Sequence, residues 1–215
     1  MRDPIIVQMP HGAPDLLILL FHGVGSTPEG LVPMGKRLAD EFPQAAIISV
    51  PSPDPCDLGA GLQWFSVRGI TEDNRAQRIA DTMPRFVERI RGLQQATGTT
   101  AEQTVLIGFS QGAIMALEVT QKDELVAGRV ASFAGRFANP PQQPPAATTL
   151  HFIHGKNDPV IAYGYAVSAA ERLISLGADV TLDLVPQLAH GINAEAVDLL
   201  VMRLKAPLAA QPQSQ

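Results

Sequence analysis

Short runs of apolar residues alternate along the chain with longer stretches in which apolar residues recur every three or four positions. The short runs predict buried strands, and the longer stretches predict amphipathic helices. The predicted strands are residues 5–7, 16–21, 46–50, 104–109, 129–133, 150–153 and 180–185. The predicted helices are residues 28–41, 74–97, 111–121, 161–176 and 194–205. Wholly apolar strands separated by helices predict an α/β fold, with a mostly parallel sheet covered by helices on both faces.

Three proline-containing segments bear on how the chain is organised. Pro84 lies inside the helical pattern of residues 74–97, which predicts a kink or two separate helices. The proline-rich segment 139–145 predicts a loop between two strands, because strands and helices continue to alternate after it; a linker between domains is the alternative. We therefore expect a single domain over residues 1–206. Residues 207–215, rich in proline and glutamine, predict a flexible C-terminal tail.

The composition of the 215 residues excludes several classes of protein. Hydrophobic residues make up 46%, which is enough for a full core and excludes a disordered or fibrous chain. The net charge of −5 argues against nucleic acid as a partner, because phosphate binding needs a basic face. Cys56 is the single cysteine, which fits a reducing compartment. Neither a signal peptide nor a membrane-spanning run is apparent, so we expect a cytoplasmic protein without stable membrane association.

The segment Gly-Phe-Ser-Gln-Gly at residues 108–112 matches the G-x-S-x-G pattern of a nucleophile elbow. It follows an apolar run and precedes a helical pattern, and this order of strand, sharp turn and helix is the setting that the motif requires. The turn would expose the Ser110 hydroxyl above the sheet at a helix N-terminus, where backbone N–H groups favour negative charge. Ser110 as an ordinary helix N-cap is the alternative.

A serine hydroxyl is a weak nucleophile unless a neighbouring base takes its proton. In proteins with this strand–turn–helix motif, the acid and then the histidine follow the serine along the chain. His190 lies in the loop after the last predicted strand, from which a base can reach over the sheet; a merely exposed histidine is the alternative. Asp158 lies just past a strand's carboxyl end, where catalytic groups of open α/β sheets gather. It also suits a helix N-cap before Pro159, and we expect the two roles to exclude each other.

Two further segments predict the surroundings of the serine. The glycines of Phe-His-Gly-Val-Gly at residues 21–25 would let backbone N–H groups turn into the site, so the expected oxyanion donors are the N–H of Gln111 and one from this loop. His22 is expected to hold the loop by hydrogen bonds. Trp64 and Phe65 are the expected wall of the substrate site, with Trp64 as core filler an equal alternative.

Metal and cofactor chemistry finds no support in the sequence. His151 and His154 stand three apart on a predicted strand, so their side chains point to opposite faces of the sheet. The sequence contains no H-E-x-x-H, no paired cysteines, and no Rossmann or P-loop glycine pattern. We expect neither a metal site nor a cofactor.

Together these residues resemble the phospholipase/carboxylesterase family of α/β-hydrolases, which includes acyl-protein thioesterases and bacterial carboxylesterases. The landmarks are F-H-G-V-G at 21–25, Q-W-F at 63–65, G-F-S-Q-G-A at 108–113, H-G-x-x-D-P-V at 154–160 and A-H-G at 189–191. The resemblance implies Ser110 as nucleophile, Asp158 as orienting acid, His190 as base, and Val24 and Gln111 as backbone oxyanion donors. Ser66 stands where many members carry an acidic residue, which leaves open how the loop around Trp64 is held.

The expected activity is hydrolysis of short-chain carboxylic esters through an acyl-enzyme on Ser110. The segment between residues 134 and 149 leaves no room for a helical lid, and an open pocket buries a long acyl chain poorly. The alternatives are an acyl-protein thioesterase or lysophospholipase, and a non-catalytic binding protein on a hydrolase scaffold. The expected partner is a small-molecule ester, and the expected assembly is a monomer or homodimer.

Overall fold

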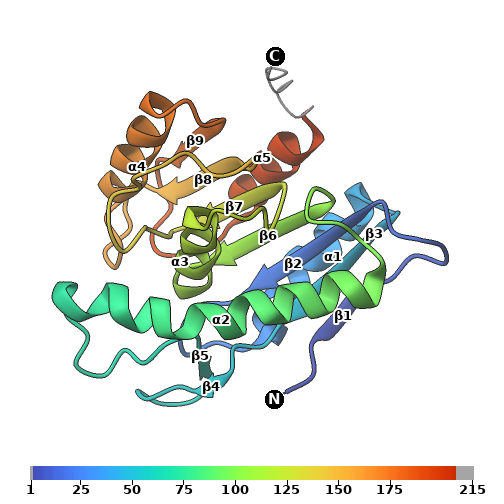
Figure 1. Ribbon diagram of the computed structural model, residues 1–215, viewed down its shortest axis with the longest axis horizontal. Helices are drawn as coiled ribbons and strands as arrows, with labels where there is room; N and C mark the ends of the chain where they lie inside the picture. The colour runs from blue at the N-terminus through green and yellow to red at the C-terminus, as the bar shows by residue number, and fades with distance from the viewer. Residues whose placement is uncertain (1, 207–215) are drawn as a thin grey trace.

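A computed structural model describes residues 2–206, in which one sheet has the strand order β1-β3-β2-β6-β7-β8-β9 (Figure 1). Neighbouring strands are parallel, except that β1 pairs antiparallel with β3. The strands are β1 (Ile5–Gln8), β2 (Leu16–Phe21), β3 (Ala45–Val50), β6 (Thr104–Phe109), β7 (Arg129–Phe133), β8 (Thr149–Gly155) and β9 (Val180–Val185). The predicted mostly parallel sheet is therefore confirmed, and all seven predicted strands belong to it.

Helices cover both faces of the sheet, as predicted. One face packs against α2 (Glu72–Thr97), α3 (Gln111–Glu118) and α4 (Gly164–Ser175), and the other against α1 (Val32–Glu41) and α5 (Ala194–Lys205). The short 3-10 segments η1 (Pro28–Leu31) and η2 (Val119–Gln121) flank α1 and α3. They account for the first and last turns of the helices predicted at 28–41 and 111–121.

The long helix α2 runs unbroken through Pro84, so the expectation of two separate helices is wrong. Proline removes one backbone donor, but the apolar face of α2 packs into the core through Ile79 and Phe86, and packing of that kind supplies most helical stability in proteins. The helix starts at a reciprocal capping box formed by Thr71 and Asn74.

A small hairpin of β4 (Asp54–Pro55) and β5 (Leu62–Gln63) lies outside the main sheet. Strands of two residues have no periodicity, which is why the apolar pattern does not predict them. A bridge between Ser26 and Leu62 joins the hairpin to the loop after β2.

The segment 134–148 joins β7 to its sheet neighbour β8, which excludes the alternative of a linker between domains. The segment contains neither helix nor strand, so no helical lid is built there. The tail predicted at 207–215 lies outside the described residues. Over residues 2–206 no helix has both the length and the apolar character needed to cross a bilayer.

Candidate active site

The three side chains predicted to act together form one continuous chain of hydrogen bonds. Ser110 Oγ lies 2.9 Å from His190 Nε2, and His190 Nδ1 lies 2.8 Å from Asp158 Oδ2. They come from the loops after β6, β9 and β8, whose carboxyl ends meet at the same edge of the parallel sheet. Since a carboxylate only accepts, Nδ1 carries the imidazole proton and Nε2 is free to accept the proton of the serine hydroxyl.

The backbone around Ser110 explains why glycines flank it. Ser110 has φ 52°, in a region that non-glycine residues rarely adopt. A Cβ on Gly108 would lie 2.4 Å from the nitrogen of Ala113, and one on Gly112 would lie 2.2 Å from the carbonyl oxygen of Phe21. Ser110 stands at the N-cap position of α3, but its side chain makes no capping hydrogen bond, so the N-cap alternative is wrong.

Asp158 uses its two carboxylate oxygens for different tasks. Oδ1 accepts the N–H groups of Val160 at 2.8 Å and Ile161 at 2.9 Å, and Oδ2 accepts from His190. The alternative that Asp158 is a helix N-cap is wrong, because α4 begins at Gly164 with Tyr163 at its N-cap. Asp158 Oδ1 instead closes the turn at 158–161 that precedes this helix.

The charge on Asp158 is stabilised by these donors, although its side chain is 0% exposed. Burial raises the pKa of its carboxyl, but the hydrogen bonds from His190, Ile161 and Val160 outweigh burial and hold the pKa below its usual range. Asp158 is thus an ionised acceptor beside the imidazole at neutral pH.

His154 is a neighbour of the site that the sequence did not reveal. Its Nε2 lies 2.8 Å from the carbonyl oxygen of Ile161 and 3.3 Å from Asp158 Oδ2. Both neighbours are acceptors, so Nε2 carries the proton of this imidazole. Burial lowers the pKa of His154, which keeps the ring neutral. In the part of the chain that the structure describes, no group of three histidine, cysteine, aspartate or glutamate side chains is placed to hold a metal ion.

The loop after β2 lies directly against the nucleophile turn. A Cβ on Gly23 would lie 3.3 Å from Ser110 Cβ, so only glycine fits there without displacing a neighbour. His22 donates from Nδ1 to the carbonyl of Gly23 and accepts the N–H of Ser52 at Nε2, at 2.8 and 3.1 Å. The expectation that His22 holds this loop is confirmed. Burial lowers the pKa of the His22 ring, which favours the neutral form that these bonds require.

The predicted oxyanion donors belong to two neighbouring segments, the loop after β2 and the first turn of α3. Gln111 is the first residue of α3, so its backbone N–H has no acceptor within the helix. Val24 follows Gly23 in the adjoining loop and is 38% exposed. Backbone from the loop after β2 and from the first turn of α3 therefore meets at Ser110, an arrangement that is typical of a site in which N–H groups bind an oxyanion.

Trp64 and Phe65 do not form the wall that the sequence led us to expect. Their side chains are 2% and 3% exposed. The indole packs against Phe21 and Phe86, with ring centroids 5.5 and 5.3 Å apart. Large aromatic rings gain most from full burial, which explains why this pair fills the core between β2 and α2.

The loop that follows Trp64 is held by a serine and a distant acid. Ser66 Oγ donates to Asp57 Oδ2 at 2.5 Å, and Arg78 donates to the carbonyl oxygens of Ser66 and Arg68, each at 2.8 Å. The hydrogen bond from Ser66 is the main reason that the pKa of Asp57 is lowered. The loop after Trp64 is therefore held by the carboxylate of Asp57, which lies nine residues before Ser66 in the chain.

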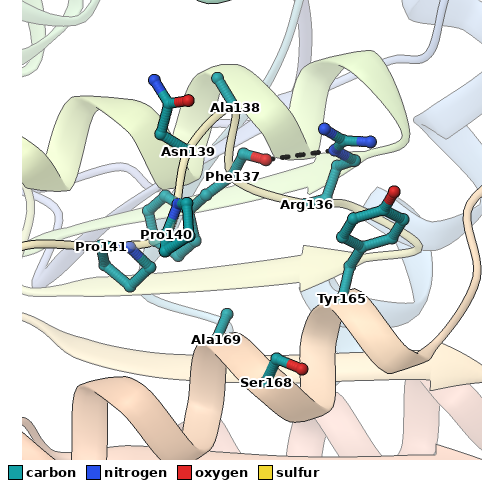
Figure 2. Close-up of a pocket in the computed structure, with 9 residues that line it drawn as sticks. All are labelled: Arg136, Phe137, Ala138, Asn139, Pro140, Pro141, Tyr165, Ser168 and Ala169. Carbon is teal, nitrogen blue, oxygen red and sulfur yellow. Dashed lines mark hydrogen bonds between the residues drawn. The ribbon is translucent and has the colours of Figure 1, made fainter. Parts of the chain in front are cut away.

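An apolar pocket of about 120 Å³ lies between the segment after β7 and α4 (Figure 2). At one end Arg136 pairs with Glu72 at 2.5 Å and lies 4.2 Å over the ring of Tyr165. The lining residues are Arg136, Phe137, Ala138, Asn139, Pro140, Pro141, Tyr165, Ser168 and Ala169.

The start of this pocket wall is tied to the nucleophile turn. The N–H of Ser110 donates to the carbonyl of Phe133 at 2.9 Å. A Cβ on Gly135 would lie 2.5 Å from Ala113 Cβ, so this glycine packs directly on α3. Arg136, the first residue of the pocket wall, follows Gly135 directly in the chain; Ser110, Asp158 and His190 are not among the residues that line the pocket.

Comparisons with known proteins show what this chain is similar to. Esterase YpfH of Escherichia coli (strain K12) is 46% identical over 204 residues, covering 95% of this chain and 88% of that protein. Acyl-protein thioesterase 1 of Cryptococcus neoformans is 26% identical over 180 residues, covering 77% and 75%. Among solved structures, esterase PE8 has a TM-score of 0.85 at 25% identity and covers 94% and 96% of the two chains.

A carboxylesterase from Mesorhizobium loti has a TM-score of 0.77 at 18% identity, with 90% of each chain covered, which shows a shared fold. The expected α/β-hydrolase fold is confirmed by these neighbours and by the sheet described above. The phospholipase/carboxylesterase family model matches residues 3–206, and the chain belongs to that family.

Proposed function

We propose that this protein is a serine carboxylesterase that hydrolyses short-chain carboxylic esters through an acyl-enzyme on Ser110. The observation that carries the proposal is the hydrogen-bonded chain from Ser110 through His190 to Asp158, at 2.9 and 2.8 Å. Membership of the family and the 46% identity to an esterase support it. Cytoplasmic location, a monomer or homodimer, and the absence of nucleic-acid partners stay predictions.

The proposed reaction assigns one group to each step. Ser110 Oγ attacks the ester carbonyl and passes its proton to His190 Nε2, while Asp158 accepts the Nδ1–H and stabilises the imidazolium. The N–H groups of Val24 and Gln111 bind the oxyanion, each worth about 3 kcal/mol. The imidazolium then protonates the leaving alcohol. Water attacks the acyl-enzyme with His190 again as base, which releases the acid and restores Ser110.

We further propose that the pocket beside Arg136 receives the acyl chain, and its size suits a short one. Its volume of about 120 Å³ is smaller than the ~150 Å³ cavity that accommodates benzene in another protein. A chain of about four carbon atoms fits such a space, whereas a palmitoyl chain does not. The mostly apolar lining, including Phe137 and Ala169, suits a hydrocarbon.

An acyl-chain-length profile of the purified enzyme and its Ser110→Ala variant tests this proposal. We expect kcat/KM for p-nitrophenyl esters to be highest at acetate to butyrate, and to be lost in the variant. A maximum at palmitoyl thioesters would favour the acyl-protein thioesterase that the relative from Cryptococcus represents. Failure of a fluorophosphonate to label Ser110 would favour the non-catalytic alternative.

A further inference from the structure

We propose that Trp64 is a positioning residue that holds the two halves of the oxyanion hole at a fixed separation. The inference rests on the proposed function, since it takes Val24 and Gln111 as the donors. One half is the loop after β2, and the other is the first turn of α3. Trp64 belongs to neither element, because it follows the short strand β5.

The two N–H groups of Trp64 reach both halves. Its indole Nε1–H donates to the carbonyl oxygen of His22 at 2.9 Å, and His22 lies two residues before Val24 in the same loop. Its backbone N–H donates to the side-chain Oε1 of Gln111 at 2.7 Å. Gln111 Nε2 in turn donates to the carbonyl of Phe65 at 2.7 Å, so the side-chain amide of Gln111 is hydrogen-bonded to both Trp64 and Phe65.

The position of Trp64 is itself strongly restrained. The ring is 2% exposed and packs edge-on against Phe21 and Phe86. Its backbone continues into the loop that Arg78 and Asp57 hold. Because Trp64 is held in place, its two hydrogen bonds fix the separation between His22 and the side chain of Gln111.

Such a restraint matters because oxyanion stabilisation depends steeply on geometry. Donors must lie about 2.7–3.1 Å from the developing oxyanion. A displacement of about 1 Å is enough to cost about 100-fold in rate. Direct packing brings the halves together, since a Cβ on Gly112 would meet the carbonyl oxygens of Phe21 and His22. The bonds of His22 tie the loop to Ser52, and the two bonds of Trp64 add a directional link from the loop to the first turn of α3.

The test replaces only the indole donor. Trp64→Phe keeps an aromatic core residue and loses the Nε1–H. We expect kcat for p-nitrophenyl butyrate to fall about 10- to 100-fold while KM changes less than about twofold. The affinity for an alkyl trifluoromethyl ketone, whose adduct with Ser110 carries an oxyanion, should fall by the same factor as kcat/KM.

Phe86→Leu is the matched control, because it loosens the same aromatic cluster but leaves both hydrogen bonds of Trp64 intact. We expect it to lower the urea midpoint and to lower kcat much less than Trp64→Phe does. Should Trp64→Phe fail to fold, Gln111→Met removes the other hydrogen bond of Trp64 and keeps the backbone N–H of residue 111; the same loss in kcat and ketone affinity is expected.

The proposal is overturned if Trp64→Phe keeps wild-type kcat, or if Phe86→Leu loses kcat to the same extent. The combined Trp64→Phe and Gln111→Met variant should lose little more kcat than the worse single variant, because both substitutions break the same link between the two halves. Losses in kcat that multiply fully would contradict the proposal. Failure of the proposed function itself is distinguishable, because turnover would then persist in Ser110→Ala.

Discussion

Replacing Asp158 with asparagine should remove most of the activity by reversing the proton position on His190. The structure dictates how the new amide must sit. The position of Oδ1 faces the N–H groups of Val160 and Ile161, so it must remain an oxygen. The NH₂ group therefore takes the place of Oδ2 and points at His190 Nδ1, 2.8 Å away. Nδ1 must then accept, which moves the imidazole proton to Nε2.

The expected loss follows from that tautomer. With its proton on Nε2, His190 cannot accept from Ser110 Oγ at 2.9 Å, so the base is blocked rather than displaced. The same change in a Ser-His-Asp protease lowers kcat by about 10⁴-fold. At about 1.4 kcal/mol per tenfold, this corresponds to about 5 kcal/mol in activation free energy.

The assay is steady-state hydrolysis of p-nitrophenyl butyrate at pH 7.5, with urea unfolding run beside it. Asp183→Asn is the matched control, because that aspartate pairs with Arg203 on β9 and α5, outside the hydrogen-bonded chain of the site. We expect the control to keep its kcat. A decrease in kcat of less than about tenfold in the Asp158→Asn variant would refute the reasoning.

Three further predictions concern stability and specificity. Burial lowers the pKa of His151 to about 4, so its imidazole binds a proton in the unfolded chain but not in the folded one between about pH 6.5 and pH 4; this histidine alone should lower the unfolding free energy by about 2 kcal/mol between pH 7 and pH 5, and His151→Gln should reduce the decrease seen in urea titrations by that amount. Gly112→Ala should lower stability by about 2 kcal/mol or more, since its Cβ would meet the carbonyl of Phe21 at 2.2 Å, whereas Gly164→Ala, with open space, should not; equal midpoints would contradict this. Ala169→Leu should fill the pocket and lower kcat/KM for butyrate at least tenfold relative to acetate; an unchanged ratio would remove the pocket from the acyl site.

The sequence predicts well what depends on periodicity and on the order of elements. The strands at 16–21, 104–109 and 129–133 have the predicted bounds, because short, mostly apolar runs in a covered sheet are bounded by polar or turn-forming residues. The meeting of Ser110 with His190 also follows from order alone, since parallel strands present their carboxyl ends, and the loops after them, at one edge.

Contacts between separate loops could not be read from the sequence. The approach of His154 to Asp158 depends on the tight turn at 158–161, which no pattern specifies. The burial of Trp64 depends on its neighbours Phe21 and Phe86, which are distant in the chain. An aromatic residue in a loop suits a wall and a core equally, so only the packing decides between them.

The central claim is that Ser110 becomes acylated during turnover, with His190 as its base. Acid quenching of the reaction with p-nitrophenyl butyrate, followed by peptide mass mapping, tests it directly. We predict a butyryl adduct on the peptide that carries Ser110, and no adduct when His190 is replaced by alanine. A butyryl group on any other residue, or turnover with unmodified Ser110 under conditions in which deacylation limits the rate, would contradict the account.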